Sequence, residues 1–478
     1  MTIEREVEIQ SNNSTVASWL DPSGHPVILT IPPTVYPPRE DSVLLDNMLA
    51  GLGPGTGKTL LEIGCGSGAI SISAAKRGWS VSSCDINPFA VAATIGNAKD
   101  LGVVNSINVA EGGPGEEGDW WPEEGVDVIV WNLPYMDPPD TDKEGLGPLE
   151  DAAMIDSSCG AKLAAELVES PHILNPGGII LLLHSSNEVG RNLPPIWRRL
   201  GWSTRVQRSE VIGDEELTVI AVWRPYAMSP PILMDTCDST NSEILDGDYQ
   251  IGQLIQTYKQ KSGRGRKNKL WESGKGSFLG SWSISSNSIE GSPGYFQMGA
   301  SIAILDTFSS FLGFGLPSHS WANGSRLTEL GVLLKWPNDI YLEMAKEYAK
   351  ICGILVEGKT KAGNTRIAIG IGINSIGPNI GVNTAGWRDI PGLQNVKLER
   401  ISEVLHASMS SVFEIHPLLE NTAFDCILEG QYNALIPSFN AGGNQNIGAI
   451  IGISKNGHLL TVNGEINSLD ELDWHWNC

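Results

Sequence analysis

Short apolar runs alternate with helix-like segments through the first half of the chain. The runs at residues 60–63, 81–85, 128–131 and 217–223 have the length and composition of buried strands. Apolar positions that recur between residues 44 and 49, after an acidic start, predict a helix, and residues 69–76 predict another. Residues 171–184 predict the end of a helix, a turn and a further buried strand. Alternating strands and helices predict an α/β fold for this half.

The second half has a different pattern. Residues 296–312 are apolar with many small side chains, which predicts a buried helix. Asn-Gly pairs at 456–457 and 463–464 lie between short apolar runs and predict two tight hairpins. Prolines at 225, 230 and 231 stand in a segment without periodicity, so residues 224–231 are expected to form a short, stiff linker between two domains.

Length and charge narrow the class of protein. The 478 residues exceed what one core usually supports, so we expect several domains. The net charge is −23, and residues 1–226 hold 14 Lys and Arg against 31 Asp and Glu, or −17. Such a surface repels nucleic-acid phosphates, so a protein substrate is favoured over DNA or RNA, although a solubility adaptation would give the same charge.

Seven scattered cysteines, none spaced Cys-x-x-Cys, predict neither a disulfide framework nor a zinc site. No apolar run approaches the roughly 18 residues that a membrane span needs, and the polar N-terminus does not have the pattern of a signal peptide. We therefore expect a cytoplasmic protein without membrane contact.

Two glycine-rich stretches suggest phosphate or cofactor binding, and they are not equivalent. Residues 53–59 lack the first glycine of a P-loop and precede a strand, so we interpret them as a surface turn. Gly64, Gly66 and Gly68 instead follow a predicted strand and open a helix, as in the cradles for nicotinamide, flavin and adenosylmethionine cofactors. Asp85 ends the next strand, where a carboxylate can bind a ribose diol. Nicotinamide binding remains open on these features alone.

Residues 128–135 (Val-Ile-Val-Trp-Asn-Leu-Pro-Tyr) bring an amide, a proline and an aromatic ring to the end of a strand. Amide and exocyclic nitrogens are poor nucleophiles because their lone pairs are delocalised. The carbonyls of Asn132 and Pro134 can accept their N–H hydrogens and orient the lone pair, while Tyr135 packs on the substrate plane. Together with the glycine loop, this motif resembles the S-adenosylmethionine (SAM)-dependent methyltransferases that act on such nitrogens.

Residues 36–42, 85–88 and 213–223 further resemble the HemK-type release-factor glutamine methyltransferases, over about residues 25–225. The resemblance implies a Rossmann-like domain, a translation release factor as methyl acceptor and a small zinc-binding activator protein as partner. It implies SAM binding by Glu40, Asp41, Glu62, Gly64, Gly66, Gly68, Asp85 and Asn132. Leu133 stands where that family usually has proline, a form similar to the adenine-N6 dimethylases of ribosomal RNA. Methylation of adenine in RNA or DNA, or an inactive scaffold that recruits an acceptor protein, are the alternatives.

A basic glycine loop dominates the second half. In residues 260–271, Gly263 and Gly265 allow close backbone approach to an anion, while Arg264 and Arg266 provide forked donors for phosphate or carboxylate oxygens. The loop follows Asp-Ser-Thr-Asn at 238–241 and precedes motifs at 335–339, 350–357 and 370–374. In this order the motifs closely resemble the biotin protein ligases over residues 232–478, which implies an α+β catalytic domain and an SH3-like β-barrel at the C-terminus.

The ligase resemblance implies ATP, biotin and Mg²⁺ as ligands and a biotin carboxyl carrier protein as acceptor. Lys350 and Arg266 would neutralise the biotin carboxylate and the ATP α-phosphate as they react, and Asp339 would bind Mg²⁺. Biotin would contact Ser239, Thr240, Gln260, Arg264, Gly353 and Gly372. ATP and the adenylate would contact Gly263, Gly265, Arg266, Trp271, Lys335, Asn338 and Asn374. Asn268 and Ser277 stand where the family commonly has glycine.

The sequence thus predicts a bifunctional enzyme with three domains. Residues 1–226 form the methyltransferase domain, 232–440 the ligase catalytic domain and 441–478 the SH3-like domain. The N-terminal repressor helix-turn-helix of some biotin ligases has no counterpart here.

Overall fold

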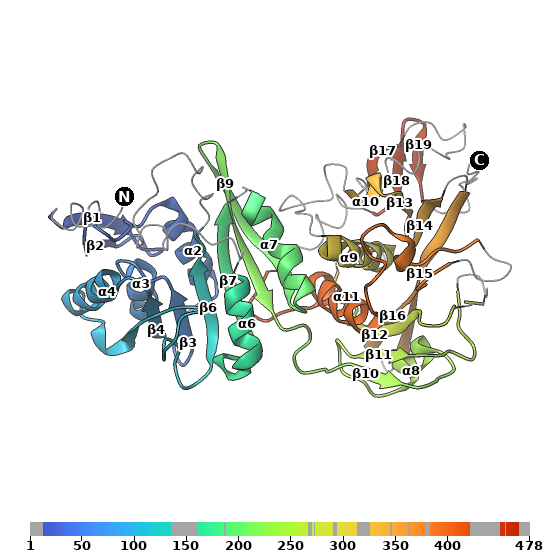
Figure 1. Ribbon diagram of the computed structural model, residues 1–478, viewed down its shortest axis with the longest axis horizontal. Coiled ribbons are helices and arrows are strands. Elements are labelled where there is room, and N and C mark those ends of the chain that lie inside the picture. Colours follow the sequence, from blue (N-terminus) through green and yellow to red (C-terminus); the bar gives the residue numbers. More distant parts are fainter. Residues whose placement is uncertain are drawn as a thin grey trace. The chain divides into compact units, whose positions relative to one another are not determined.

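The computed structural model describes residues 13–134, 160–185, 188–265, 270–271, 273–289, 294–312, 326–344, 347–361, 364–377, 383–420, 450–454 and 456–467 (Figure 1). The chain divides into two compact units. The first comprises Met1–Trp197, Val206–Arg224 and Pro417–Glu420, and the second comprises Arg198–Arg205, Pro225–His416 and Asn421–Cys478. Each unit has its own seven-stranded sheet and its own hydrophobic core.

The sheet of the first unit has the order β5-β4-β3-β6-β7-β9-β8. Its strands are β5 (Ile107–Glu111), β4 (Ser80–Asp85), β3 (Thr59–Ile63), β6 (Val126–Asn132), β7 (Leu174–Ser185), β9 (Glu215–Trp223) and β8 (Ser203–Ile212). The pairs from β5 to β7 are parallel, whereas β9 pairs antiparallel to β7. The strand predicted at 217–223 is present as β9, second from the edge, and β8 forms the edge.

Helices cover both faces of this sheet. Alternate strand residues, such as Leu60 and Val128, share one buried core with α2 (Glu40–Gly51), α3 (Ala69–Lys76) and α4 (Pro88–Asp100). Figure 1 places α6 (Ala161–Glu169) and α7 (Glu188–Arg199) on the opposite side. The hairpin of β1 (Thr15–Leu20) and β2 (Pro26–Ile31) packs against the same core as α4. The predicted helices at 44–49 and 69–76 are confirmed as α2 and α3.

The predicted turn within residues 171–184 lies inside a strand. A short 3-10 helix, η2 (Pro171–Ile173), leads directly into β7. The β6–β7 register then shifts, since Val126 pairs with Leu174 but Val128 pairs with Ile179. The extra residues bulge from the ladder around Gly177, whose φ is +77°.

The second unit is an antiparallel-rich sheet with helices on its two faces. The order is β10-β11-β12-β16-β15-β14-β13. The strands are β10 (Ile232–Met234), β11 (Leu254–Thr257), β12 (Phe278–Ser285), β16 (Asn364–Ile373), β15 (Glu347–Lys361), β14 (Asp339–Met344) and β13 (Val332–Lys335). Long helices α9 (Gly294–Leu312) and α11 (Leu398–Phe413) share the main core with one face, whereas α8 (Thr240–Asp246) packs with Ile255 and Ala368 on the other. Short helices α10 (Arg326–Glu329) and η4 (Trp387–Asp389) also belong to this unit, whereas the short helix η1 (Val104–Ser106) belongs to the first.

Helix α9 confirms the buried helix predicted at 296–312. Its small polar side chains are compatible with burial because their hydroxyls donate to carbonyls of the preceding turn. Ser301 Oγ donates to Met298 O at 2.8 Å, and Thr307 Oγ1 donates to Ala303 O at 2.8 Å.

The segment predicted as a linker contains a core residue. Tyr226 is 5% exposed, belongs to the main core of the second unit and has a left-handed φ of +42°. Its N–H donates to Glu414 Oε2 at 2.8 Å. Proline content indicated stiffness, but it could not reveal that the ring between the prolines packs inward.

Near the C-terminus, β17 (Ile450–Ile453), β18 (Leu459–Thr461) and β19 (Gly464–Ile466) form a three-stranded antiparallel sheet. Both predicted hairpins are present, with Gly457 and Gly464 at positive φ. The Asn-Gly pairs do not form two-residue loops, because Ser454 bonds to His458 across residues 455–457 and Thr461 pairs with Gly464 across residues 462–463. Leu459 and Ile466 join the main core of the second unit. The predicted SH3-like barrel would also need residues 441–449 and 468–478, which lie outside the described residues.

Candidate active sites

The glycine turn of the first unit holds the backbone where three parallel strands end. Ile63 pairs with both Cys84 and Trp131, so the ends of β3, β4 and β6 lie side by side, the edge at which open α/β sheets bind ligands. The N–H of Gly66, at a φ of +53°, donates to Asp85 Oδ2 at 2.9 Å. This hydrogen bond ties the turn after β3 to the carboxylate at the end of β4.

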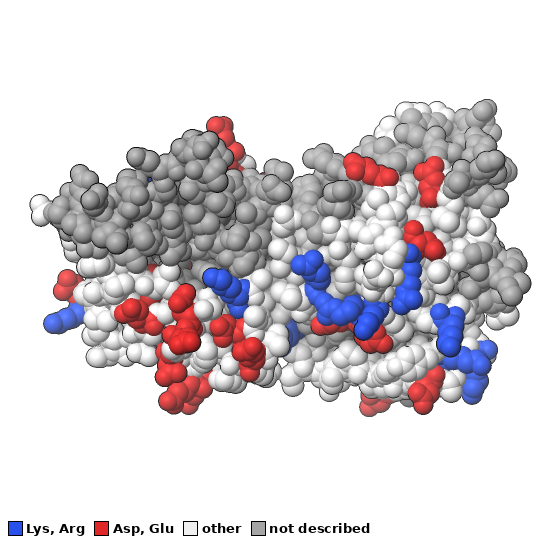
Figure 2. Space-filling view, viewed as in Figure 1, with Lys and Arg blue, Asp and Glu red and all other residues white. Residues whose placement is uncertain are grey.

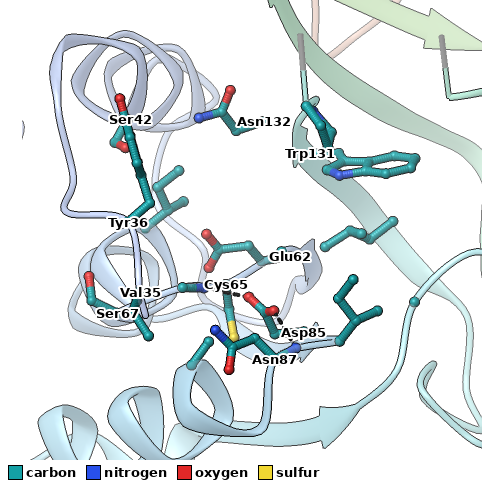
Figure 3. Close-up of a pocket in the computed structure, with 18 of the residues that line it drawn as sticks. Val35, Tyr36, Ser42, Glu62, Cys65, Ser67, Asp85, Asn87, Trp131 and Asn132 are labelled. Carbon is teal, nitrogen blue, oxygen red and sulfur yellow. Dashed lines mark hydrogen bonds between the residues drawn. The ribbon is translucent and has the colours of Figure 1, made fainter. Parts of the chain in front are cut away.

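A cavity of about 830 Å³ opens over this edge (Figure 3). Predicted SAM-site residues on its walls are Asp41, Glu62, Gly64, Gly66, Asp85 and Asn132, and predicted Pro134 lies there too. Two predicted residues are not on the wall. Glu40 is exposed. Gly68 is buried against α4, where an added Cβ would be 2.9 Å from Thr94 Cγ2. Gly68 thus permits close packing of α3 on α4. Tyr135 lies outside the described residues.

Asn132 has a fixed orientation in this cavity. Its Nδ2 donates to Asp41 Oδ2 at 2.9 Å, and the Ser42 N–H donates to Asp41 Oδ1 at 2.6 Å. A carboxylate only accepts hydrogens, so it selects the amide nitrogen of Asn132 and turns the amide oxygen away. That oxygen, Oδ1, is buried and has no hydrogen-bond partner among the described residues. An unsatisfied buried acceptor on a cavity wall fits a ligand that supplies an N–H.

Two further carboxylates give the cavity an acidic interior. Burial raises the pKa of Glu62 to about 8, although Ser71 Oγ donates to it. Burial also raises the pKa of Asp85, against the lowering effect of the Asn87 and Gly66 N–H donors. Both groups would be more stable as anions beside a cation. A sulfonium cofactor with an ammonium group and a ribose diol fits these donors and acceptors.

Several wall residues were not predicted as site residues. Asn87 caps α4 by accepting the Phe89 N–H, and its Nδ2 donates to Thr34 O at 3.0 Å, which joins the loop before α2 to the site. The sequence contained this signal, since Asn87-Pro88 is a strong helix start. Lys162, Glu116 and Glu215 also line the cavity. Their positions depend on loop and helix packing, so no local pattern indicates them.

In the second unit, predicted ligase residues meet on the face of the sheet that also bears α8. Gly353 on β15 pairs directly with Gly372 on β16. The Trp271 indole lies over both, because an added Cβ at either position would be 2.7 Å or less from its ring. Lys350 Nζ is 5.6 Å from the centre of the same ring. Two glycines on neighbouring strands thus create the space that one indole fills.

Lys350 is also paired with a carboxylate. Its Nζ lies 2.9 Å from Asp339 Oδ1, and its backbone carbonyl accepts from Asn374 Nδ2 at 3.2 Å. Asn338 Nδ2 donates to Ile354 O at 3.1 Å. Lys335 lies opposite Asp339 on the β13–β14 hairpin, with its Nζ 5.9 Å from the Tyr341 ring. The motifs at 335–339, 350–353 and 372–374 therefore form one cluster.

Asp339 has little support as a magnesium ligand. Its carboxylate oxygen is engaged by Lys350, and no group of three or more His, Cys, Asp or Glu side chains suited to a metal occurs within the described ranges. Magnesium binding at Asp339 therefore remains a prediction.

The residues predicted to hold the biotin ring lie farther along the same sheet face. Thr240 donates its N–H to Gln260 Oε1 at 2.9 Å, and Arg264 Nη2 donates to Glu357 Oε2 at 2.9 Å. Ser239 is buried at the start of α8. Gly370 lies two residues from Gly372 on β16, so both face this side.

The basic loop is described at its two ends. The N–H of Trp271 donates to Gly263 O at 2.9 Å, and Arg264 bridges to Leu270. Gly265 precedes residues 266–269, so Arg266 and Asn268 lie outside the described residues. Ser277 is buried, and it needs no left-handed backbone because its neighbour Gly276 takes the positive φ of +77°.

The four described cysteines, Cys65, Cys84, Cys237 and Cys352, are buried and free. In the part of the chain that the structure describes, none of the helices combines the length and apolar content that a membrane crossing requires.

Comparison with known proteins separates the two halves in the same way. Residues 233–374 match the biotin/lipoate A/B protein ligase family, and residues 45–134 match the family of ribosomal protein L11 methyltransferase (PrmA). These two matches confirm the predicted combination of a methyltransferase-like and a biotin-ligase-like domain, without their substrates. The match does not extend to the HemK-type assignment, because the matched methyltransferase family is a different one.

Solved structures with similarity include two biotin ligases and a ribosomal protein L11 methylase, each with a TM-score under 0.5. A biotin protein ligase from Aquifex aeolicus in complex with biotin and ATP has 19% identity and covers 52% of this chain and 96% of its own, with a TM-score of 0.32. Biotin acetyl coenzyme A carboxylase synthetase from Helicobacter pylori with bound biotinylated ATP has 18% identity and covers 50% and 100%, with a TM-score of 0.33. Ribosomal protein L11 methylase from Lactobacillus delbrueckii subsp. bulgaricus has 16% identity and covers 39% and 80%, with a TM-score of 0.27. A search of curated protein sequences found no match.

Proposed function

We propose that the chain is a bifunctional enzyme. Its second half would use ATP to biotinylate an acceptor lysine on a biotin carboxyl carrier protein through biotinyl-5′-AMP. Its first half would transfer a methyl group from SAM to a side-chain nitrogen, with a glutamine of a translation release factor as the acceptor. A small zinc-binding activator protein is a further proposed partner. The two activities rest on separate observations and are tested separately.

For the ligase half, the polar side chains of Gln260 and Arg264 favour biotin over lipoate as the ligand. The matched family includes both biotin and lipoate ligases. Biotin has a ureido ring that needs donors and acceptors, whereas the dithiolane ring of lipoate offers almost none. Gln260 and Arg264 are polar, fixed by hydrogen bonds and on the same sheet face as Gly353 and Gly372. A dithiolane would leave such groups unpaired, which costs binding free energy.

In this mechanism, Lys350 acts where charge accumulates. The biotin carboxylate attacks an α-phosphate that is already anionic, so a cation at the meeting point stabilises the transition state. Lys350 lies beside the Gly353–Gly372 pair and the Trp271 indole that packs over it. Arg266 is proposed to assist it. Pyrophosphate release measured with ATP and either biotin or lipoate tests the assignment, because faster release with lipoate would contradict it.

For the methyltransferase half, the buried Oδ1 of Asn132, which has no partner among the described residues, is the observation that carries the proposal. SAM would supply an electrophilic methyl group at this cavity. Asn132 Oδ1 and the Pro134 carbonyl would accept the N–H hydrogens of a planar acceptor and so direct its lone pair toward the methyl group. The hydrogen bond to Asp41 fixes the Asn132 amide so that Oδ1 points away from this carboxylate. The same arrangement also fits the amino group of adenine. The hydrogen-bonding chemistry alone is therefore compatible with either a glutamine side chain or an adenine base as methyl acceptor.

Charge favours a protein acceptor over a nucleic acid. On the face seen in Figure 2, Asp and Glu predominate over Lys and Arg on the first unit. Residues 1–226 carry a net charge of −17, which opposes binding of a phosphate backbone.

The decisive experiment is incubation of the chain with radiolabelled SAM and cell extract, followed by separation of protein from nucleic acid. Label in a protein supports the proposal, and label in RNA or DNA supports adenine methylation. SAM binding without any transfer would favour the inactive scaffold.

A further inference from the structure

A continuous chain of hydrogen bonds joins the two side chains at the proposed biotin-ring site of the second unit. It begins at Gln260, ends at Arg264 and connects four segments that are distant in sequence. The intermediate members are Thr240, Ser281, Asn241 and Glu357. Thr240, Asn241 and Ser281 are buried, with 3% or less of each residue exposed. A buried polar chain is stable only when its members are satisfied.

The chemistry of the members determines where the hydrogens lie. Arg264 only donates and the Glu357 carboxylate only accepts, so Arg264 Nη2 donates to Glu357 Oε2 at 2.9 Å. Asn241 Nδ2 also donates to Glu357 Oε2, at 2.7 Å, and to Leu355 O at 3.2 Å. The Asn241 amide oxygen must then face Ser281.

The other arm continues from this amide oxygen. Asn241 Oδ1 lies 2.6 Å from Ser281 Oγ, and Ser281 Oγ lies 2.7 Å from Thr240 Oγ1. Because the amide oxygen cannot donate, the single hydrogen of Ser281 goes to it. The Thr240 N–H donates to Gln260 Oε1 at 2.9 Å, which leaves the Gln260 amide nitrogen available to donate to a ligand. A Cβ at Gly370 would be 2.4 Å from Asn241 Oδ1, so this glycine gives the chain its space.

Glu357 is the member on which the chain depends. It is the carboxylate of the chain, and one of its oxygens receives both Asn241 and Arg264. Asn241 uses both of its amide hydrogens and its oxygen within the protein, so it anchors Glu357 and has no free hydrogen for a ligand. Arg264, whose side chain is 41% exposed, gains a defined position from Glu357. Only one of the five N–H groups of its guanidinium is needed for that bond.

We propose that Glu357 is a positioning residue for ring recognition, which acts by holding the Arg264 guanidinium and the buried Asn241 amide in place. This inference rests on the proposed biotin ligase function. It assigns Glu357 no contact with ATP. Glu357 lies four residues from Gly353 on β15, whereas Lys350 lies on the other side of Gly353. Loss of Glu357 should therefore weaken biotin binding more than it slows adenylate chemistry.

The test is biotin-dependent exchange of labelled pyrophosphate into ATP by the full chain. Glu357→Gln keeps the shape and one acceptor oxygen but removes the charge. We expect the KM for biotin to rise about 10- to 100-fold, as for loss of a charge-assisted hydrogen bond, with kcat and the KM for ATP within about threefold of wild type. Glu343→Gln, at an exposed position on β14, is the matched control and should leave all three constants unchanged.

A second variant distinguishes positioning from general destabilisation. If Glu357 acts through Arg264, then Glu357→Gln should add less than about threefold to the biotin KM of Arg264→Met, although each change alone is large. Glu357→Asp, which retains the charge, should recover part of the affinity, and it replaces Glu357→Gln if that variant does not fold. Equal losses in biotin KM, ATP KM and kcat, or additive effects in the double variant, would overturn the inference. Absence of exchange by the wild-type chain would instead overturn the proposed ligase function and this inference with it.

Discussion

Removal of the Lys350 charge should slow biotinyl-adenylate formation more than any other single change in the ligase half. Lys350 Nζ lies 2.9 Å from Asp339 Oδ1, beside the Gly353–Gly372 pair, and its side chain is 28% exposed. Two unit charges about 4 Å apart interact by roughly 4 kcal/mol at an effective dielectric constant of about 20. Partial exposure weakens this value, which leaves about 3 kcal/mol in the transition state. That corresponds to a loss of roughly 10²- to 10³-fold in rate.

The perturbation is best made in two ways. Lys350→Met keeps a long apolar side chain against Trp271 and removes the charge, whereas Lys350→Ala removes both. Either variant also leaves Asp339 unpaired next to the incoming phosphate, which adds repulsion. Lys359→Ala is the matched control. Lys359 lies on the same strand, β15, and its substitution removes an exposed ion pair with Asp246. Exposed pairs contribute little to stability, so this control should behave like wild type.

The assay is single-turnover pyrophosphate release at saturating biotin and ATP, with biotin affinity measured separately. We expect both Lys350 variants to lose about 10²-fold or more in rate and less in biotin affinity. A near-normal rate for Lys350→Met together with a slow Lys350→Ala would show that the side chain acts through packing. A wild-type rate for both variants would refute the reasoning and place the chemistry elsewhere.

Three further predictions concern the same two sites. Asn132→Ala should lower methyl-transfer turnover by about 10²-fold or more because it removes the oriented acceptor, while calorimetry should show retained SAM binding; near-normal turnover would contradict the assignment. Gly372→Ala places a Cβ 2.4 Å from Trp271 Cε2, so it should raise the KM for biotin by about 10-fold or more in the pyrophosphate exchange assay. The control is Gly358→Ala on β15, where the nearest atom to the added Cβ is 3.8 Å away, and it should have no effect. Burial raises the pKa of Glu62 to about 8 from 4.5, so the folded state binds this proton more tightly than the unfolded state, and the ligand-free first unit should lose stability as pH rises between these values. In Glu62→Gln the thermal unfolding midpoint should depend less on pH over this range. An unchanged pH dependence of the midpoint would refute this cause.

Local sequence determined several of the elements and the glycine turn after β3. Gly64, Gly66 and Gly68 lie between an apolar run and a helix, and the structure has β3 and α3 at the predicted residues. Strand-end residues were also predictable in principle, because parallel strands in one sheet end at one edge. Asp85 and Asn132 therefore line the same cavity. Asn-Gly pairs located both C-terminal hairpins, since few residues adopt positive φ without strain, but they did not give the loop residues.

Tertiary structure decided the contacts between segments that are distant in sequence. The Asp41–Asn132 hydrogen bond spans 91 residues and the Arg264–Glu357 pair spans 93, so no local pattern indicates either partner. Gly353 and Gly372 were predicted to admit a ligand, but only the cross-strand register revealed that one indole lies over both. Tyr226 was assigned to a linker because its neighbours are prolines, yet its ring is buried in the core. A sequence specifies which groups can donate, accept or turn, whereas their partners depend on how the sheets and helices pack.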